Sequence, residues 1–115
     1  MSMDKDVKII AIDTATDYLT FGIYAGGKMV FEKTVFASKR HSEILPDILK
    51  TALSESNLSL SEISHVALSI GPGSYTGLRV GVSFVQGLVF AKPAIKIIGV
   101  DTLQAMAFTF APCEY

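Results

Sequence analysis

The sequence predicts an α/β domain with a mixed five-stranded sheet and flanking helices. Short apolar runs typical of buried strands alternate with segments whose apolar residues recur at the period of a helix. A Gly-Gly turn joins two of the strands as a hairpin. A glycine-rich loop, residues 71–77, connects the fourth apolar run directly to a helix. A right-handed crossover then makes the first, fourth and fifth strands parallel, with the hairpin alongside.

Each element follows from its local pattern. The expected strands are residues 7–14, 19–24, 29–36, 65–70 and 96–100. The expected helices are residues 42–56, 77–91 and 103–108. The first helix contains Pro46, which a helix tolerates only near its start, and Asn57 suits its end. His41 is expected just before this helix, as a surface or capping side chain.

The loop between the fourth strand and the second helix is the first candidate site. Together with Asp13 at the end of the first strand, it forms an expected anion or nucleotide site of Asp13, Gly71, Gly73, Ser74, Thr76, Gly77 and Arg79. Ser74 and Thr76 are both N-cap candidates. Two other interpretations remain open: a glycine turn that only redirects the chain, and a loop shaped for a protein partner.

Two nucleotide-binding motifs are excluded. The dinucleotide fingerprint requires its third glycine one position before Gly77, and Asp101 lies 28 residues after Gly73 instead of about 20. The phosphate-binding loop of NTPases requires a lysine, and none follows these glycines.

Arg79 is expected in the first turn of the second helix, where the positive end of the helix dipole disfavours a cation by about 0.3–1 kcal/mol. A negative group is therefore expected beside it. The candidates are Asp13, a carboxylate of a partner subunit, and a phosphate held by the amides of residues 73–77. We rank a carboxylate first, internal or from a partner, because such pairs are common.

The second helix is apolar on two faces, so it is predicted to be buried on two faces. One stripe contains Leu78, Val82, Val85 and Val89, and the other contains Gly77, Gly81, Phe84 and Leu88. Gly77 and Gly81 would allow another backbone to come close. Either the first helix covers the second stripe, or another protein chain does.

Composition limits the classes of function. Half of the residues are hydrophobic, which suggests apolar surface covered by a missing domain or a partner. The net charge of −1 provides no overall field toward nucleic acid or a membrane. Cys113 is the single cysteine, so no disulfide or cysteine-based metal framework forms within the chain. The polar start lacks a signal region, and no apolar run approaches about 18 residues, so we expect a cytoplasmic protein without a membrane segment.

Four sequence blocks carry a family resemblance: Ala-Ile-Asp-Thr-Ala-Thr (11–16), His-Ser-Glu-Ile-Leu-Pro (41–46), Gly-Pro-Gly-Ser-Tyr-Thr-Gly-Leu-Arg-Val-Gly (71–81) and Gly-Val-Asp-Thr-Leu-Gln-Ala-Met-Ala (99–107). In this order they resemble TsaB, also called YeaZ, the bacterial partner of the tRNA threonylcarbamoyladenosine enzyme TsaD. The resemblance implies an RNase-H-like domain of the actin/sugar-kinase/Hsp70 (ASKHA) superfamily. It implies an N-terminal domain at 7–108 and a divergent or truncated tail at 109–115, with the family's second domain absent. The polar residues 1–6 are expected to be disordered or a cloning remnant.

The resemblance also implies a scaffold role without catalysis. TsaD carries a His-x-x-x-His metal pair where this chain has Thr102 and Met106, so neither a metal nor a catalytic residue is expected here. Kinase-type relatives have glycine at the position of Ala15, so ATP or ADP is expected only at the interface of a complex. The partner-binding helices would use Ile44, Leu45, Ile48, Gly81, Phe84, Val85 and Leu88.

The partners that the resemblance implies are TsaD, TsaE and, in the absence of TsaD, a second copy of the chain, with tRNA contacted only indirectly. The alternative functions are an ATP-binding enzyme of the ASKHA type that uses Asp13 and the glycine loop, and a glycoprotease-like hydrolase.

Overall fold

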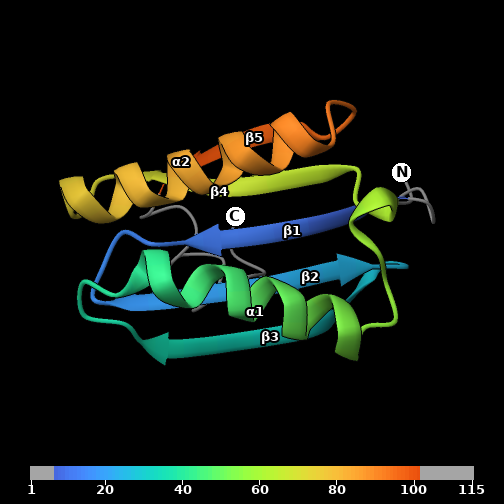
Figure 1. Ribbon diagram of the computed structural model, residues 1–115, viewed down its shortest axis with the longest axis horizontal. Helices are drawn as coiled ribbons and strands as arrows, with labels where there is room; N and C mark the ends of the chain where they lie inside the picture. The colour runs from blue at the N-terminus through green and yellow to red at the C-terminus, as the bar shows by residue number, and fades with distance from the viewer. Residues whose placement is uncertain (1–6, 102–115) are drawn as a thin grey trace, which may run out of the picture.

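The computed structural model describes residues 7–101, and its elements follow the predicted order (Figure 1). The strands are β1 Lys8–Asp13, β2 Tyr18–Ala25, β3 Lys28–Phe36, β4 His65–Gly71 and β5 Lys96–Asp101. The helices are α1 His41–Glu55 and α2 Tyr75–Ala91, with a short 3-10 turn, η1 Leu60–Glu62, between α1 and β4. The helix expected at 103–108 and the segments at 1–6 and 109–115 lie outside the described residues.

The sheet has the predicted mixed topology, with strand order β3-β2-β1-β4-β5. β1 pairs antiparallel with β2 and parallel with β4, and β4 pairs parallel with β5. The predicted hairpin between β2 and β3 is confirmed. Gly26 and Gly27 have φ angles of +63° and +83°, as a two-residue turn between twisted strands requires.

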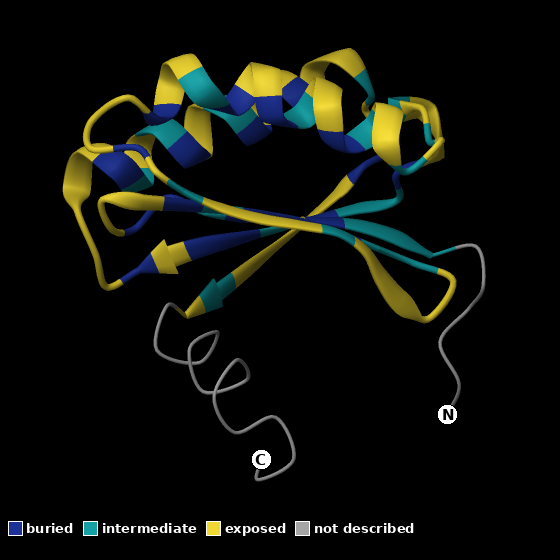
Figure 2. Cartoon of the chain, turned by 90° about the horizontal axis from the view of Figure 1, so that it is seen from below, coloured by how far each residue is buried: buried dark blue, intermediate teal, exposed yellow. Residues whose placement is uncertain are grey.

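Both helices pack on one face of the sheet and form a single layer (Figures 1 and 2). Their inner sides are buried against it, whereas much of their outer surface is exposed (Figure 2). The largest fully buried side chains come from three strands and both helices: Ile10, Leu19, Phe21, Ile23, Val66, Leu45 and Val85. The core therefore lies between the sheet and the helical layer.

The α1 helix begins at His41, which was predicted to precede the helix as a surface or capping residue. That prediction was wrong. His41 is buried, with 5% of its surface exposed, and its Nε2 lies 2.9 Å from the carbonyl oxygen of Thr16. At the other end, Asn57 adopts a φ of +56°, and the amide of Leu58 donates to the carbonyl of Leu53. This hydrogen bond and the positive φ of Asn57 form the helix-terminating motif that favours glycine or asparagine. The predicted role of Asn57 is therefore confirmed.

The α2 helix begins at Tyr75, two residues before its predicted start. Ser74 is the N-cap, and its Oγ accepts a hydrogen bond from the amide of Gly77 at 3.2 Å. Thr76, the other capping candidate, lies within the first turn. Arg79 is consequently the fifth helical residue, where the helix dipole is weaker than the sequence suggested.

The α2 helix lies very close to the loop that follows β1. A Cβ atom on Gly77 would overlap the carbonyl oxygen of Thr14, and one on Gly81 would lie 2.7 Å from Thr14 Oγ1. The hydroxyl of Thr14 donates to the carbonyl of Gly77 at 2.6 Å. We had expected α1 or a second chain to cover these glycines. Instead, the β1–β2 loop and Leu68 of β4 cover them.

A matched pair of helix substitutions tests this contact. Gly77→Ala should lower the free energy of unfolding by about 1–3 kcal/mol, because the added methyl group displaces α2 from the loop. Gly87→Ala is the control, since a Cβ at Gly87 meets nothing within 4 Å. It should raise stability by up to about 1 kcal/mol through helix propensity. Urea unfolding of both variants measures the difference, and equal effects would contradict the packing role of Gly77.

Candidate functional site

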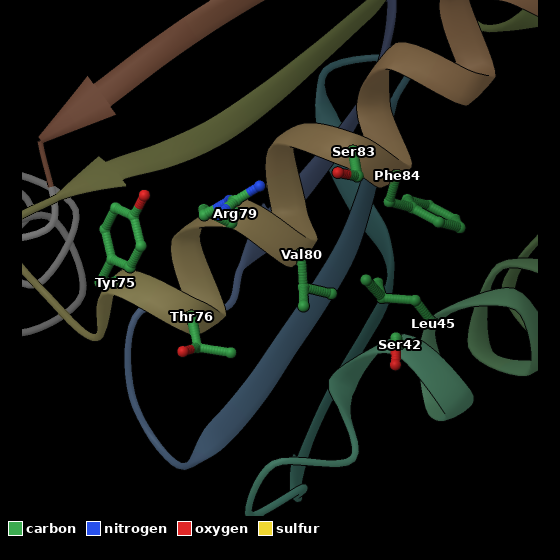
Figure 3. Close-up of a pocket in the computed structure, with 8 residues that line it drawn as sticks. All are labelled: Ser42, Leu45, Tyr75, Thr76, Arg79, Val80, Ser83 and Phe84. Carbon is green, nitrogen blue, oxygen red and sulfur yellow. The ribbon is translucent and has the colours of Figure 1, made fainter.

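A groove of about 540 Å³ lies between the N-terminal halves of α1 and α2 (Figure 3). Leu45 of α1 and Val80 of α2 point toward each other across it (Figure 3), and Phe84 completes an apolar floor. Polar side chains line the remainder of the groove: Ser42, Thr76, Ser83, Tyr75 and Arg79. None of these lining residues is acidic, and Arg79 is the one basic residue. The groove therefore combines an apolar floor with one positive charge.

Arg79 and Tyr75 form one unit at the edge of this groove. The guanidinium carbon of Arg79 lies 5.6 Å from the centroid of the Tyr75 ring, a cation–π contact. Both side chains lie on the flank of α2 away from Leu45 (Figure 3), and Tyr75 is 73% exposed. This contact restrains the guanidinium without neutralising its charge.

Asp13, one of the three candidate partners of Arg79, does not pair with it. Asp13 Oδ1 instead accepts a hydrogen bond from the amide of Ala15 at 2.9 Å, which orders the turn after β1. Between residues 7 and 101 the one ion pair joins Arg40 to Glu43, at 3.5 Å on the surface of α1. Arg79 therefore has no carboxylate partner within this part of the chain.

The glycines of the candidate anion loop are required for different physical reasons. Gly71 has a φ of +117°, a conformation that side chains other than glycine rarely adopt. Gly73 and Gly77 are required instead because Ala15 and Thr14 lie against them. The amide of Ser74 donates to the carbonyl of Ala15 at 2.7 Å. Two amides expected to face an anion, those of Ser74 and Gly77, are therefore already bonded within the protein.

The buried face of α2 differs from both predicted stripes. Its buried residues are Gly77, Gly81, Val85 and Leu88, so Gly81, Val85 and Leu88 are core residues and not a surface for a partner. Leu45 and Ile48 of α1 are likewise buried, and Ile44 is half-buried, whereas Phe84 lines the groove. The expected partner-binding set is thus mostly interior, because the helical layer turns these positions toward the sheet.

The exposed face of α2 contains large side chains, of which only Val82 belonged to a predicted stripe, and that stripe was expected to be buried. Tyr75, Val82 and Phe90 are 73%, 41% and 90% exposed. In its 17 residues α2 has one charged side chain, Arg79, where about four are expected from average composition. The exposed side of α1 in contrast contains Glu43, Asp47, Lys50 and Glu55. The scarcity of charged residues in α2 was visible in the sequence and could have predicted this exposed face.

Residues 7–101 contain neither a metal-binding cluster nor a membrane-spanning helix. No group of three or more His, Cys, Asp and Glu side chains there could hold a metal ion. Thr102 and Met106, which the resemblance was expected to align with the histidine pair of TsaD, lie outside the described residues. Neither described helix has the length and apolar character required to cross a membrane.

Comparisons with solved structures identify the class of protein. YeaZ from Pseudomonas aeruginosa superimposes with a TM-score of 0.84 at 25% identity, over 94% of this chain and 51% of that chain. A Bacteroides thetaiotaomicron protein with an actin-like ATPase fold and Thermus thermophilus RuvC have TM-scores of 0.60 and 0.58 at 10% and 15% identity, which shows shared fold alone. The domain therefore has the RNase-H-like fold of the ASKHA superfamily.

Comparisons with sequences identify the family. Residues 35–112 match the model of TsaD, tRNA N6-adenosine threonylcarbamoyltransferase. The Escherichia coli tRNA threonylcarbamoyladenosine biosynthesis protein TsaB is 35% identical over 88% of this chain and 43% of that protein. The Clostridium novyi transferase is 28% identical over 89% of this chain and 34% of that protein. The chain belongs to the TsaD-type family, on its TsaB (YeaZ) branch, and spans about half the length of its TsaB relatives.

Arg79→Ala tests whether Arg79 has a partner inside the chain. Because Asp13 faces Ala15 instead, the substitution should change the free energy of unfolding by less than about 0.5 kcal/mol, as is usual for a surface position. Thermal or urea unfolding measures this change. A loss above about 1 kcal/mol would show that an internal anion stabilises Arg79.

Proposed function

We propose that this chain acts as a non-catalytic partner subunit of TsaD in the synthesis of N6-threonylcarbamoyladenosine at position 37 of tRNA. One observation carries the proposal: within the described residues, the outer face of α2 is uncovered, has a single charge and exposes three large apolar side chains, Tyr75, Val82 and Phe90. Isolated apolar residues are ordinary on a protein surface, but a helix with aromatic residues at both ends and a single arginine resembles the centre of an interface.

The comparisons support this choice of partner. TsaB-type and TsaD-type relatives each align with close to nine-tenths of this chain, so the two kinds of protein share this domain. Two homologous domains can pair through equivalent surfaces related by an approximate two-fold axis. In this arrangement the helical layer of this chain packs on the corresponding layer of TsaD, with α2 near the centre.

The dimensions of the surface fit such an interface. A helix of 17 residues is ~25 Å long, sufficient to lie along a partner helix for several turns. Helices that pair in this way are ~8–10 Å apart, so residues on both sides of the contact line are covered. We accordingly place Tyr75, Val82 and Phe90 in the contact, with the charged side of α1 at its edge.

The proposal assigns catalysis to TsaD and scaffolding to this chain. Thr102 and Met106 in place of a histidine pair are the sequence feature behind this division. TsaE as a further subunit, a homodimer in the absence of TsaD, indirect contact with tRNA, and ATP or ADP bound only at the interface of the complex are parts of the same proposal.

Two exposed phenylalanines provide a matched test. Phe90→Ser should weaken binding to TsaD at least about tenfold, because truncating an aromatic residue that anchors an interface is costly. Phe36→Ser is the control: Phe36 is 62% exposed at the end of β3, the edge strand at the opposite side of the molecule from α2 (Figure 1). Its affinity should stay within twofold of wild type. Isothermal titration calorimetry with TsaD measures both, and circular dichroism verifies the fold.

Equal affinities of the two variants for TsaD would contradict the assignment of α2 to the interface. A wild-type chain that does not bind TsaD would contradict the proposed function itself.

A further inference from the structure

Arg79 is the one charge on a helix face that the proposed function buries, and this inference rests on that function. Outside a complex the guanidinium is exposed and hydrated, so it requires no counter-ion. Inside an interface the surrounding water is removed, and an unpaired buried charge is strongly unfavourable. The arginine must therefore acquire an anionic neighbour when α2 is covered.

The described part of the chain does not supply that anion. Asp13 is bonded to the amide of Ala15, and Glu43 lies beside Arg40. No residue that lines the groove is acidic. The ring of Tyr75 lies against the guanidinium, and we infer that the N–H groups at its edge are available to pair with a planar group that offers two oxygens.

We propose that the partner subunit places an aspartate or glutamate carboxylate on Arg79 while an apolar side chain of the same partner segment occupies the groove. The apolar part would contact Leu45, Val80 and Phe84, which form the floor. The groove and the charge lie on adjacent sides of the N-terminal half of α2, so a single docked helix can contact both (Figure 3). Arg79 would then determine which partner binds and in which register its helix docks.

A carboxylate fits this site better than a phosphate group. Phosphate sites in proteins usually combine several free backbone amides or more than one cation. Here two of the five amides of residues 73–77, those of Ser74 and Gly77, are bonded within the protein, and Arg79 is the single cation lining the groove. One arginine held against an aromatic ring matches the two oxygens of one carboxylate.

Zero-length cross-linking tests the contact directly. Arg79→Lys retains the cation and introduces a primary amine, which a carbodiimide couples only to a carboxylate in contact with it. The complex of this variant with TsaD should yield a peptide in which Lys at position 79 is joined to one Asp or Glu of TsaD. Arg40→Lys is the matched control, because Arg40 is an exposed arginine that already faces Glu43. It should give no cross-link to TsaD.

Affinity provides an independent readout. Arg79→Ala should weaken TsaD binding by about 30-fold or more, since truncating one member of a buried interfacial charge pair has effects of this size. Affinity within twofold of wild type, or a bound Arg79→Lys variant that gives no cross-link at position 79, would overturn the inference and leave the proposed function intact. A wild-type chain that fails to bind TsaD would instead reject the proposed function.

The phosphate alternative has its own measurement. Wild type and Arg79→Ala are titrated with ADP and with inorganic phosphate, in the absence of TsaD. We expect no difference between the two proteins. If wild type binds either compound and the variant does not, while both bind TsaD within twofold of one another, Arg79 is a phosphate ligand and the inference is wrong.

Discussion

The close approach of the β1–β2 loop to α2 is the contact on which the arrangement of this domain depends. Thr14 and Ala15 directly follow β1. They occupy the space that side chains at positions 77 and 73 would need, which is why glycines stand there. The hydrogen bonds from Thr14 Oγ1 to the carbonyl of Gly77 and from the Ser74 amide to the carbonyl of Ala15 join the same two segments. Since β1 is the central strand of the sheet, this contact fixes the start of α2 at the carboxyl end of the central strand.

The contact also fixes the rotation of α2 about its own axis. With Gly77 and Gly81 directed at the loop, the positions half a turn away must face outward, and these include Tyr75, Arg79 and Val82. The nature of the outer face is therefore a consequence of the glycines on the inner face. A rotation of one residue would place a side chain against Thr14 and turn part of the outer face into the core, so the exposed face of α2 and its packing are set together.

Much of the fold could be predicted from local patterns, because the strands, the glycine hairpin and the end of α1 at Asn57 are determined by neighbouring residues. The buried face of α2 could not, because apolar residues occur around most of its circumference and periodicity alone does not select one side. The burial of His41 could not be predicted either, because it depends on a contact with Thr16, which lies 25 residues away in the sequence. The hydrogen bond that Asp13 makes is in contrast local, to the amide of Ala15. The groove was not predictable, since two helices distant in sequence form it.

The two halves of α2 are held to the sheet in different ways, and this explains where a partner can act. Val85 and Leu88 bury large side chains in the C-terminal half, with 1% and 7% of their surfaces exposed. In the N-terminal half the inner positions are glycines, so backbone contacts replace side-chain packing there and the groove beside Leu45 remains open. Leu78 and Val80 of that half are half-buried, whereas Tyr75 and Arg79 are exposed and add nothing to the core of the described domain. Burial of such residues contributes roughly 25 cal/mol per Å² of apolar surface only when another surface covers them, so their stabilising effect belongs to an assembled state.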